Sequence, residues 1–463
     1  MPGGIELRGM RVLVVGLART GVATALFCAE HEARVTATDL RDETELKEAT
    51  AKLRDAKVAL ELGGHRAETY VAQDLIVVSP GVPADDAFLQ MARAKGITIW
   101  SEIELAYRFL EGKLIGITGS NGKTTTATLV AHILRGAGFN TFLAGNVGTP
   151  MISSVEDTRE DSVTVVELSS FQLELIATFR PDIGVILNLT PDHLDRHRTL
   201  EAYGAAKARL FENQTELDYA VLNADDPTLA AYVPSKPLGF SFSRKQMVAQ
   251  GAFVRERQII FRHNEREEAI LSREEVPLPG EHNLENVLAA VCAARLAGAK
   301  TDAIARGVRS FAGVEHRLEF VAEISSVRYY NDSKATNVDA ALKALEAFPG
   351  RIIVILGGKD KDGDYRVMKP ALRDKAVLAL LIGEAAEKIA SQIAGSVNIE
   401  RVETIERAVE SASRHAKSGD VVLLSPACAS FDQFENYEHR GRVFKELVLQ
   451  LEKKSSGASA QGK

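Results

Sequence analysis

Apolar residues along the chain follow two patterns that alternate. Residues 11–15 and Leu114–Thr118 are short apolar runs typical of buried strands, and each is followed by a turn that contains glycine. After each turn, apolar residues recur every three or four positions, which predicts helices over Val22–Ala29 and Thr124–Leu134. A strand, a glycine turn and a helix repeated along a chain indicate an α/β protein with parallel sheets.

The same alternation continues to the far end of the chain. Further strands are predicted at Ala33–Thr38, Asp74–Val78, Ser162–Val166, Asp182–Leu187, Val327–Tyr330, Arg351–Leu356, Ala376–Ile382 and Asp420–Leu424. Further helices are predicted at Ala202–Phe211, Val287–Ala297 and Val338–Ala347. The run Gly280–Asn286 is expected to cap the second of these helices. Between Leu238 and Leu278, short alternating runs with many charges instead indicate a small antiparallel addition to the flank of a domain.

The turn after Thr118 has the sequence Gly-Ser-Asn-Gly-Lys-Thr, which is a shortened phosphate-binding pattern. Ile117 stands where the full pattern has its first glycine, so an ordinary turn with an exposed lysine is the competing interpretation. In favour of phosphate binding, a strand precedes the turn and a helix follows it, as the motif requires. We then expect Lys123 to reach the β- and γ-phosphates and the Thr124 hydroxyl to face magnesium.

The length of 463 residues corresponds to about three domains of roughly 150 residues each. We predict an N-terminal Rossmann-like domain (residues 1–101), a central P-loop ATPase domain with a parallel sheet and the antiparallel addition (102–312), and a C-terminal Rossmann-like domain (313–463). The polar tail from about residue 453 is expected to be disordered.

Charge and cysteine content narrow the class of protein. A net charge of −7 gives no general attraction to nucleic acid or anionic membranes, so neither is an expected partner. Cys28, Cys292 and Cys428 are far apart among small or apolar residues, which indicates buried free thiols in a reducing compartment. The chain opens without an apolar signal core and has no apolar stretch of about 18 residues, so we expect a cytoplasmic protein without membrane insertion. We also expect a monomer.

Polar residues stand where predicted strands of the middle domain end. Glu167 follows one strand, and Asp192 and His193 follow the next. A single acid at such a position is commonly a helix cap, but these groups should reach the same sheet edge as Thr124, where they would suit magnesium. Lys207 lies in a predicted helix, and that position alone favours a solvated lysine.

The first domain carries weaker signals. Gly16 and Gly21 are the glycines of its first turn, and Asp39 ends its second strand, where dinucleotide folds place an acid on a ribose. The middle glycine of the dinucleotide fingerprint is missing, which argues against NAD binding. The run Ser79–Pro83 lies at the carboxyl edge of the predicted sheet, so it is either a ligand-binding turn or only a loop terminator.

Seven motifs together carry a resemblance to a known family. They are Gly-Ser-Asn-Gly-Lys-Thr-Thr, Glu-Leu-Ser-Ser-Phe-Gln-Leu, Asp-His-Leu-Asp-Arg-His, Gly-Glu-His-Asn-Leu-Glu-Asn, His-Arg-Leu-Glu, Asn-Asp-Ser-Lys-Ala-Thr-Asn and Ser-Pro-Ala-Cys-Ala-Ser-Phe-Asp-Gln-Phe. In this order, and over nearly the whole length, the chain resembles the Mur ligase family. The resemblance implies a domain for a UDP-sugar, a central ATPase domain and a C-terminal domain for the incoming amino acid.

The resemblance also implies roles at the ATP site. Lys123, His193, Lys207 and Arg317 would act in catalysis. ATP would be bound by Gly119, Asn121, Gly122, Lys123, Thr124, Thr125, Asn283, Asn286, Arg317 and Asp332. Two magnesium ions would be held by Thr124, Glu167, His193 and Lys207, the last as a carbamate formed with carbon dioxide. Whether His193 orients a ligand or relays a proton stays open.

For the other substrates, the resemblance implies UDP-N-acetylmuramoyl-L-alanine and D-glutamate, joined through an acyl phosphate. The UDP-sugar would be bound by Leu17, Thr20, Asp39, Arg41, Ser79, Gly81 and Asn146. D-Glutamate would be bound by Thr336, Lys361, Ser430 and Tyr437. Leu40 and Tyr437 depart from the family, which more often has a hydroxyl residue and a phenylalanine there, and these departures concern affinity.

Two other classes of function remain alternatives at this point. An NAD(P)-dependent oxidoreductase is suggested by residues 11–39, although the missing glycine argues against it. A nucleotide-binding regulator without catalysis is the second, and joint retention of Glu167, His193 and Lys207 argues against it. Within the family, the Glu167 motif and the Ser-Pro-Ala-Cys-Ala-Ser run favour D-glutamate, and no Asp-Asn-Pro-Arg signature for diaminopimelate is present.

Overall fold

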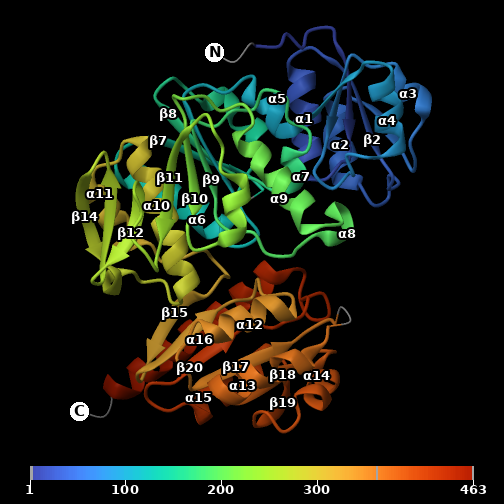
Figure 1. Ribbon diagram of the computed structural model, residues 1–463. Coiled ribbons are helices and arrows are strands. Elements are labelled where there is room, and N and C mark those ends of the chain that lie inside the picture. The colour runs from blue at the N-terminus through green and yellow to red at the C-terminus, as the bar shows by residue number, and fades with distance from the viewer. Residues whose placement is uncertain (1–3, 147, 361–362, 461–463) are drawn as a thin grey trace. The chain divides into compact units, whose positions relative to one another are not determined.

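The computed structural model describes residues 4–146, 148–360 and 363–460, which form three α/β domains, each built on its own sheet (Figure 1). By its contacts, the chain divides into two compact units. The first, Met1–Glu275 with Glu285–Ser310, holds two of the sheets. The second, Val276–Leu284 with Phe311–Lys463, holds the third. The prediction of three α/β domains with largely parallel sheets is confirmed.

The N-terminal sheet is parallel throughout and has the strand order β3-β2-β1-β4-β5. Its strands are β1 (Arg11–Val15), β2 (Arg34–Asp39), β3 (Ala59–Leu62), β4 (Leu75–Val78) and β5 (Thr98–Ser101). Its helices are α1 (Arg19–Glu30), α2 (Lys47–Asp55), α3 (Ala67–Val71), α4 (Ala87–Ala94) and α5 (Glu102–Tyr107). The strand order reverses between β1 and β4, and ligands of such sheets bind outside the carboxyl ends of the strands at that point.

The central sheet has nine strands in the order β14-β13-β12-β11-β10-β9-β6-β8-β7. They are β6 (Lys113–Thr118), β7 (Asn140–Gly145), β8 (Ser162–Glu167), β9 (Ile183–Ile186), β10 (Tyr219–Asn223), β11 (Leu238–Ser243), β12 (Gly251–Arg255), β13 (Gln258–His263) and β14 (Arg266–Ser272). Among the described strands of this sheet, antiparallel pairing is confined to β12–β13 and β13–β14, while β11 and β12 pair in parallel. The antiparallel addition therefore extends the edge of the main sheet and is shorter than residues 238–278.

Helices α6 (Lys123–Gly136), α7 (Ser170–Leu173), α8 (Leu194–His197), α9 (Leu200–Ala208), α10 (Glu281–Ala297) and α11 (Thr301–Ser310) accompany this sheet. The start of α10 differs from the prediction. Gly280–Asn286 was expected to precede the helix, whereas the helix already begins at Glu281. The reason is that glutamate and leucine in this run favour helix as much as the alanines that follow.

The C-terminal sheet has the order β15-β16-β20-β17-β18-β19. Its strands are β15 (Glu319–Ile324), β16 (Val327–Asn331), β17 (Ile352–Gly357), β18 (Ala376–Ile382), β19 (Ile399–Glu403) and β20 (Val421–Leu424), and its helices are α12 (Val338–Glu346), α13 (Lys369–Lys375), α14 (Ala386–Ile393), α15 (Ile405–His415) and α16 (Tyr437–Ala460). Only β15 among these strands pairs antiparallel, at the sheet edge. Helix α16 continues past Lys453, where disorder was expected, because residues such as Glu452 and Lys453 propagate a helix at little cost.

The three cysteines are free and buried, as predicted. Burial raises the pKa of the Cys28 thiol to about 12 and that of Cys428 to about 11, and it raises the pKa of Cys292 as well. Thiols with raised pKa form little of the reactive thiolate, so these side chains are inert packing groups. Across the described residues, no helix combines the length and the apolar content needed to cross a membrane.

Candidate active site

The loop between β6 and α6 takes its shape from two glycines. Gly119 has a φ of 151° and Gly122 a φ of 84°, which side-chain-bearing residues rarely adopt. A Cβ on Gly122 would lie 2.1 Å from Oδ1 of Asn286, so this amide packs directly against the loop. The loop opens into the N-terminus of α6, where backbone N–H groups and the helix dipole favour an anion. This backbone can therefore cradle a phosphate despite the shortened motif.

Polar residues after β9 hold this loop in place, and sequence reasoning gave them no role. The amide of Asn188 accepts a hydrogen bond from the Asn121 N–H at 2.8 Å and donates one to the Asn121 carbonyl at 3.1 Å. The Ser120 hydroxyl donates to the Thr190 carbonyl and accepts from the Thr190 N–H, both at 2.9 Å. The only sequence signal was a polar run directly after a buried strand.

Two lysines converge on one carbonyl of the loop. Nζ of Lys123 and Nζ of Lys207 each donate to the Gly119 carbonyl at 2.9 Å. Lys207 is 1% exposed, and its Nζ lies 4.3 Å from the centre of the Tyr203 ring. Burial first, and then the charge of Lys123, lower the pKa of Lys207 to about 6. The solvated position that helix placement alone favoured is therefore wrong, and this amine is mostly uncharged at neutral pH.

Glu167 ends β8 beside the loop. The sheet register places Glu167 opposite Ile117 of β6 and opposite Gly145 of β7. Its Oε1 accepts a hydrogen bond from Nδ2 of Asn146 at 2.9 Å. Its Oε2 is buried and has no hydrogen-bond partner among the described residues. A buried carboxylate oxygen without a partner is costly, so this atom fits a cation ligand.

His193 immediately precedes α8 and has a φ of 52°, a backbone conformation that is uncommon for residues other than glycine. Its ring centre is 4.9 Å from that of Phe171 and 6.3 Å from that of Tyr203, the ring that Lys207 also contacts. The imidazole is half-exposed, with 48% of the side chain accessible. His193 and Lys207 are thus brought to one side of the phosphate loop, and an exposed imidazole there is accessible to a ligand.

Six of the seven predicted UDP-sugar residues lie around the switch point of the N-terminal sheet, whereas Asn146 follows β7 of the central sheet. Asp39 accepts from the Leu17 N–H at 2.7 Å and from three N–H groups of Arg41 at 2.9 to 3.0 Å. Burial raises the pKa of Asp39, but the hydrogen bonds from Arg41 and Leu17 outweigh it and lower the pKa to about 2. The Ser79 hydroxyl donates to the Gly16 carbonyl at 2.7 Å. Thr20 is half-buried in the first turn of α1, and Gly81 is exposed in the turn after β4.

Two polar runs of the C-terminal unit lie side by side. Arg440 is fully buried and donates to the carbonyl groups of Ser333, Cys428 and Ala429. The Ser333 hydroxyl donates to the Tyr437 carbonyl at 2.8 Å. These bonds hold the run that contains Thr336 to the run that contains Ser430, so these two predicted D-glutamate residues and Tyr437 come from neighbouring segments. Lys361, the fourth predicted residue, lies outside the described residues.

Asp332 occupies a more enclosed position than a ribose contact would suggest. Its Oδ1 accepts from the Leu318 N–H at 3.1 Å, and its Oδ2 accepts from the Ser425 hydroxyl at 3.0 Å. Burial raises the pKa of Asp332 to about 7 in spite of these bonds. Arg317 is half-buried nearby, and its charge lowers the pKa of Asp332, but by less than burial raises it. In its own unit, Asn283 donates to the Pro279 carbonyl at 2.7 Å.

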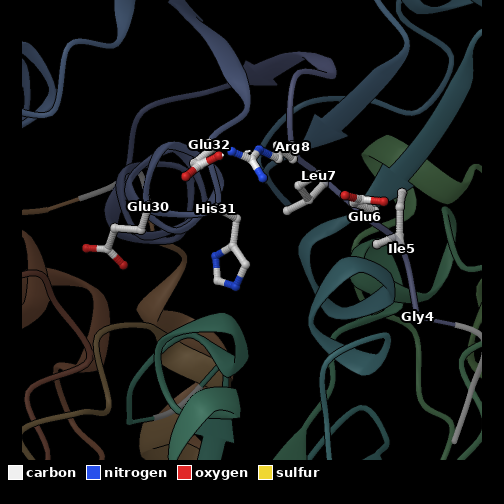
Figure 2. A pocket seen from close by; sticks show the side chains of 8 residues that line it. All are labelled: Gly4, Ile5, Glu6, Leu7, Arg8, Glu30, His31 and Glu32. Carbon is white, nitrogen blue, oxygen red and sulfur yellow. Dashed lines mark ion pairs between the residues drawn. The ribbon is translucent and has the colours of Figure 1, made fainter.

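Two hollows lie away from these residues, and a group of possible metal ligands flanks Arg317. A hollow of about 590 Å³ (Figure 2) is lined by Gly4, Ile5, Glu6, Leu7, Arg8, Glu30, His31 and Glu32. A second, of about 700 Å³, is lined by His132, Arg135, Gly136, Ala303, Arg306, Gly307, Arg309 and Ser310. Neither contains a predicted site residue. Glu315, His316 and Glu319 could hold a metal by their spacing, but Lys445 already pairs with both glutamates.

Models of one protein family match three successive parts of the chain. Residues 10–101 match the Mur ligase MurD-like N-terminal domain, residues 117–294 the Mur ligase middle domain, and residues 316–428 the Mur ligase glutamate ligase domain. A protein of Acidobacterium capsulatum named UDP-N-acetylmuramoylalanine–D-glutamate ligase is 54% identical over 96% of this chain and 97% of its own length. The chain belongs to the Mur ligase family.

Other Mur ligases agree in sequence and in fold. A protein of Koribacter versatilis with the same name is 50% identical over 96% of this chain and 99% of its own length. The MurF ligase from Thermotoga maritima, solved in complex with ADP, superposes with a TM-score of 0.59 at 18% identity, over 96% of this chain and 99% of that one. At that identity, the likeness concerns the fold. Because residues 10–101 match a Mur ligase domain, they give no support to an NAD(P)-dependent oxidoreductase.

Proposed function

We propose that this Mur ligase joins D-glutamate to UDP-N-acetylmuramoyl-L-alanine and converts ATP to ADP and phosphate. The observation that carries the proposal is the group at the carboxyl edge of the central sheet. There, two lysines meet a phosphate loop beside a buried carboxylate that has one oxygen without a partner. The name shared by relatives at 50 to 54% identity over nearly the full length supports the choice of substrates.

In the first step, a carboxylate oxygen of the UDP-sugar's alanine attacks the γ-phosphorus of ATP. The bond from that phosphorus to the β–γ bridging oxygen breaks, so ADP leaves and an acyl phosphate forms. Negative charge gathers on the transferred phosphoryl group, and the protein's task is to hold the reactants in line within a positive field. Lys123 supplies part of that field from the loop, and Arg317 of the C-terminal unit supplies more.

In the second step, the uncharged amine of D-glutamate attacks the acyl carbon. The carbon–oxygen bond to phosphate breaks, the amide forms, and the amine loses its proton to solvent or to a base in the site. Thr336, Lys361, Ser430 and Tyr437 are the residues proposed to hold the two carboxylates of the amino acid. Since the residues proposed for ATP come from both units, and those proposed for the amino acid from the second, we propose that the reaction requires groups from both units.

Magnesium fits the residues assigned to it. The buried Oε2 of Glu167 has no described partner, and Thr124 offers a hydroxyl in the first turn of α6. Hard oxygen ligands of this kind suit magnesium, which would neutralise phosphate charge when bound. We propose Thr124, Glu167, His193 and Lys207 as the residues that hold two such ions.

Lys207 is proposed to serve as a carbamate. Its buried Nζ donates to the Gly119 carbonyl and lies over the Tyr203 ring. Burial and the like charge of Lys123 disfavour the ammonium form more than Asp192 favours it. Addition of carbon dioxide to the uncharged amine, with loss of one proton, gives a carbamate anion; from the ammonium form, two protons are lost in all. That anion would pair with cations at this edge of the sheet, which removes the cost of burying an unpaired charge.

A coupled assay of phosphate release tests the proposal. We expect release from ATP only when UDP-N-acetylmuramoyl-L-alanine and an amino acid are both present, with D-glutamate strongly preferred in a panel that includes L-glutamate, L-alanine, L-lysine and diaminopimelate. Mass spectrometry of the product should show one added glutamate. Equal turnover with L-glutamate, or none with D-glutamate, would contradict the assignment.

A further inference from the structure

Arg196 joins two parts of the first unit that are far apart in sequence. It lies in α8, and its side chain is only 17% exposed. Its Nη1 donates to the Pro80 carbonyl at 3.0 Å and its Nη2 to the Val82 carbonyl at 3.1 Å. Nη2 also donates to Oε2 of Glu174 at 2.5 Å. One guanidinium therefore fixes the turn after β4 to the central domain.

The bond to Pro80 orients the next peptide group. The Pro80 carbonyl and the Gly81 N–H belong to one planar trans peptide, so they point in opposite directions. With the carbonyl directed at Arg196, the Gly81 N–H is directed away from it. No hydrogen bond from this N–H is found within the described part of the chain, and a Cβ on Gly81 would meet nothing within 4 Å. In the described part of the chain this N–H is therefore an unused donor, and it lies in an exposed turn at the sheet edge where ligands bind.

Arg196 is also tied to His193. Its N–H donates to the His193 carbonyl at 3.1 Å, and its guanidinium lies 4.1 Å from the centre of the Phe171 ring. The His193 ring lies 4.9 Å from the same phenylalanine. A shift of the turn at Pro80–Val82 would therefore pull on the segment that carries His193.

We infer that Arg196 is a positioning residue for the diphosphate of the UDP-sugar. It holds the Gly81 N–H as a donor for that diphosphate and fixes the distance from this donor to His193 at the phosphoryl-transfer site. The inference rests on the proposed function, because a substrate that spans both domains is what makes the distance matter. A guanidinium suits the task because its rigid fork reaches two carbonyl groups and a carboxylate at once, which an ammonium group cannot do.

The test compares three variants by calorimetric titration with UDP-N-acetylmuramoyl-L-alanine and by steady-state kinetics. For Arg196→Met, we expect binding of the UDP-sugar to weaken about 10- to 100-fold, as for loss of hydrogen bonds from a charged group. The KM for ATP should change less than about twofold, because the phosphate loop is held by Asn188 and Thr190 and not by this turn. Arg196→Lys should bind the UDP-sugar more tightly than Arg196→Met does, because the lysine ammonium group can still donate to one of the two carbonyl groups.

Arg198→Met is the matched control. Arg198 follows two residues later, its side chain is 84% exposed, and its nearest acid, Asp85, is 4.0 Å away. We expect wild-type binding and turnover from it. Thermal melts of all variants report whether they fold. If Arg196→Met does not fold, the affinity of Arg196→Lys for the UDP-sugar is the test of the inference. Wild-type affinity in Arg196→Lys, or an equal loss for ATP and the UDP-sugar, overturns the inference. Failure of the wild-type protein to bind the UDP-sugar would instead refute the proposed function.

Discussion

Two glycine turns of the first unit share a backbone plan and differ in charge. In the N-terminal domain, the turn between β1 and α1 has the Leu17 N–H bonded to Asp39, which is paired with Arg41. In the central domain, the loop between β6 and α6 receives Lys123 and Lys207 on one carbonyl and has no carboxylate bonded to it in the described residues. A strand–turn–helix unit is thus suited to its ligand less by its backbone than by the side chains that neighbouring strands and helices bring to it.

Removing Lys207 should have the largest effect. If the buried amine becomes an anion that holds metal, Lys207→Ala should lower kcat by at least about 10³-fold, as when a preorganised electrostatic group is lost. Added acetate should restore part of the activity, because a small carboxylate can enter the space left behind. Phosphate release measured with and without acetate checks both points. Lys236→Ala, at an exposed lysine, is the control, and full activity of Lys207→Ala would contradict the carbamate role.

Glu167→Gln should come next. Glutamine keeps an oxygen for the bond from Asn146 but loses the charge at Oε2, the atom without a described partner. We expect kcat to fall about 10²-fold and the magnesium concentration for half-maximal rate to rise, as for loss of one electrostatic contact. A magnesium titration of the ligase rate measures this. An unchanged magnesium requirement would show that Glu167 holds no metal.

Substitutions at Gly122, which precedes α6, and at Gly136, the last residue of α6, separate loop geometry from helix propensity. Gly122→Ala would force a left-handed backbone and a clash with Asn286, so we expect a loss of about 1–3 kcal/mol in unfolding free energy and weaker ATP binding. Gly136→Ala, at a position where a Cβ meets nothing, should instead gain about 0.5–1 kcal/mol. Urea unfolding and ATP titrations distinguish the two. Similar effects of both substitutions on stability and ATP binding would show that the loop does not require glycine at position 122.

The N-terminal turn should give the smallest effect, and it depends on pH. Asp39 has its pKa lowered to about 2 in the folded protein, so its contribution to stability is present above about pH 4 and is lost as the pH falls through about 2. Asp39→Asn should therefore flatten the acid limb of the stability profile. Urea midpoints between about pH 2 and 5 measure this. If the profile of Asp39→Asn is parallel to that of the wild type, ionisation of Asp39 does not contribute to the pH dependence of stability.

The sequence was sufficient for features that depend on local pattern. Continuous apolar runs predicted buried strands such as β6 and β8, and the glycines between β6 and α6 predicted the loop. It was insufficient where distant contacts decide. Strand β15 was missed because it lies at a sheet edge and carries glutamates among its apolar residues. Lys207 sits among small residues with no clear apolar stripe, so its burial depends on the loop it packs against.

The inert thiols have a practical consequence for studying how the two units cooperate. Because Cys28, Cys292 and Cys428 are buried with raised pKa values, maleimide dyes should leave them unlabelled in the native state. A cysteine introduced on the surface of each unit would then be the only labelling position there. Energy transfer between two such dyes could report any change in the distance between the units as ATP, the UDP-sugar and the amino acid are added in turn, without removal of any native cysteine.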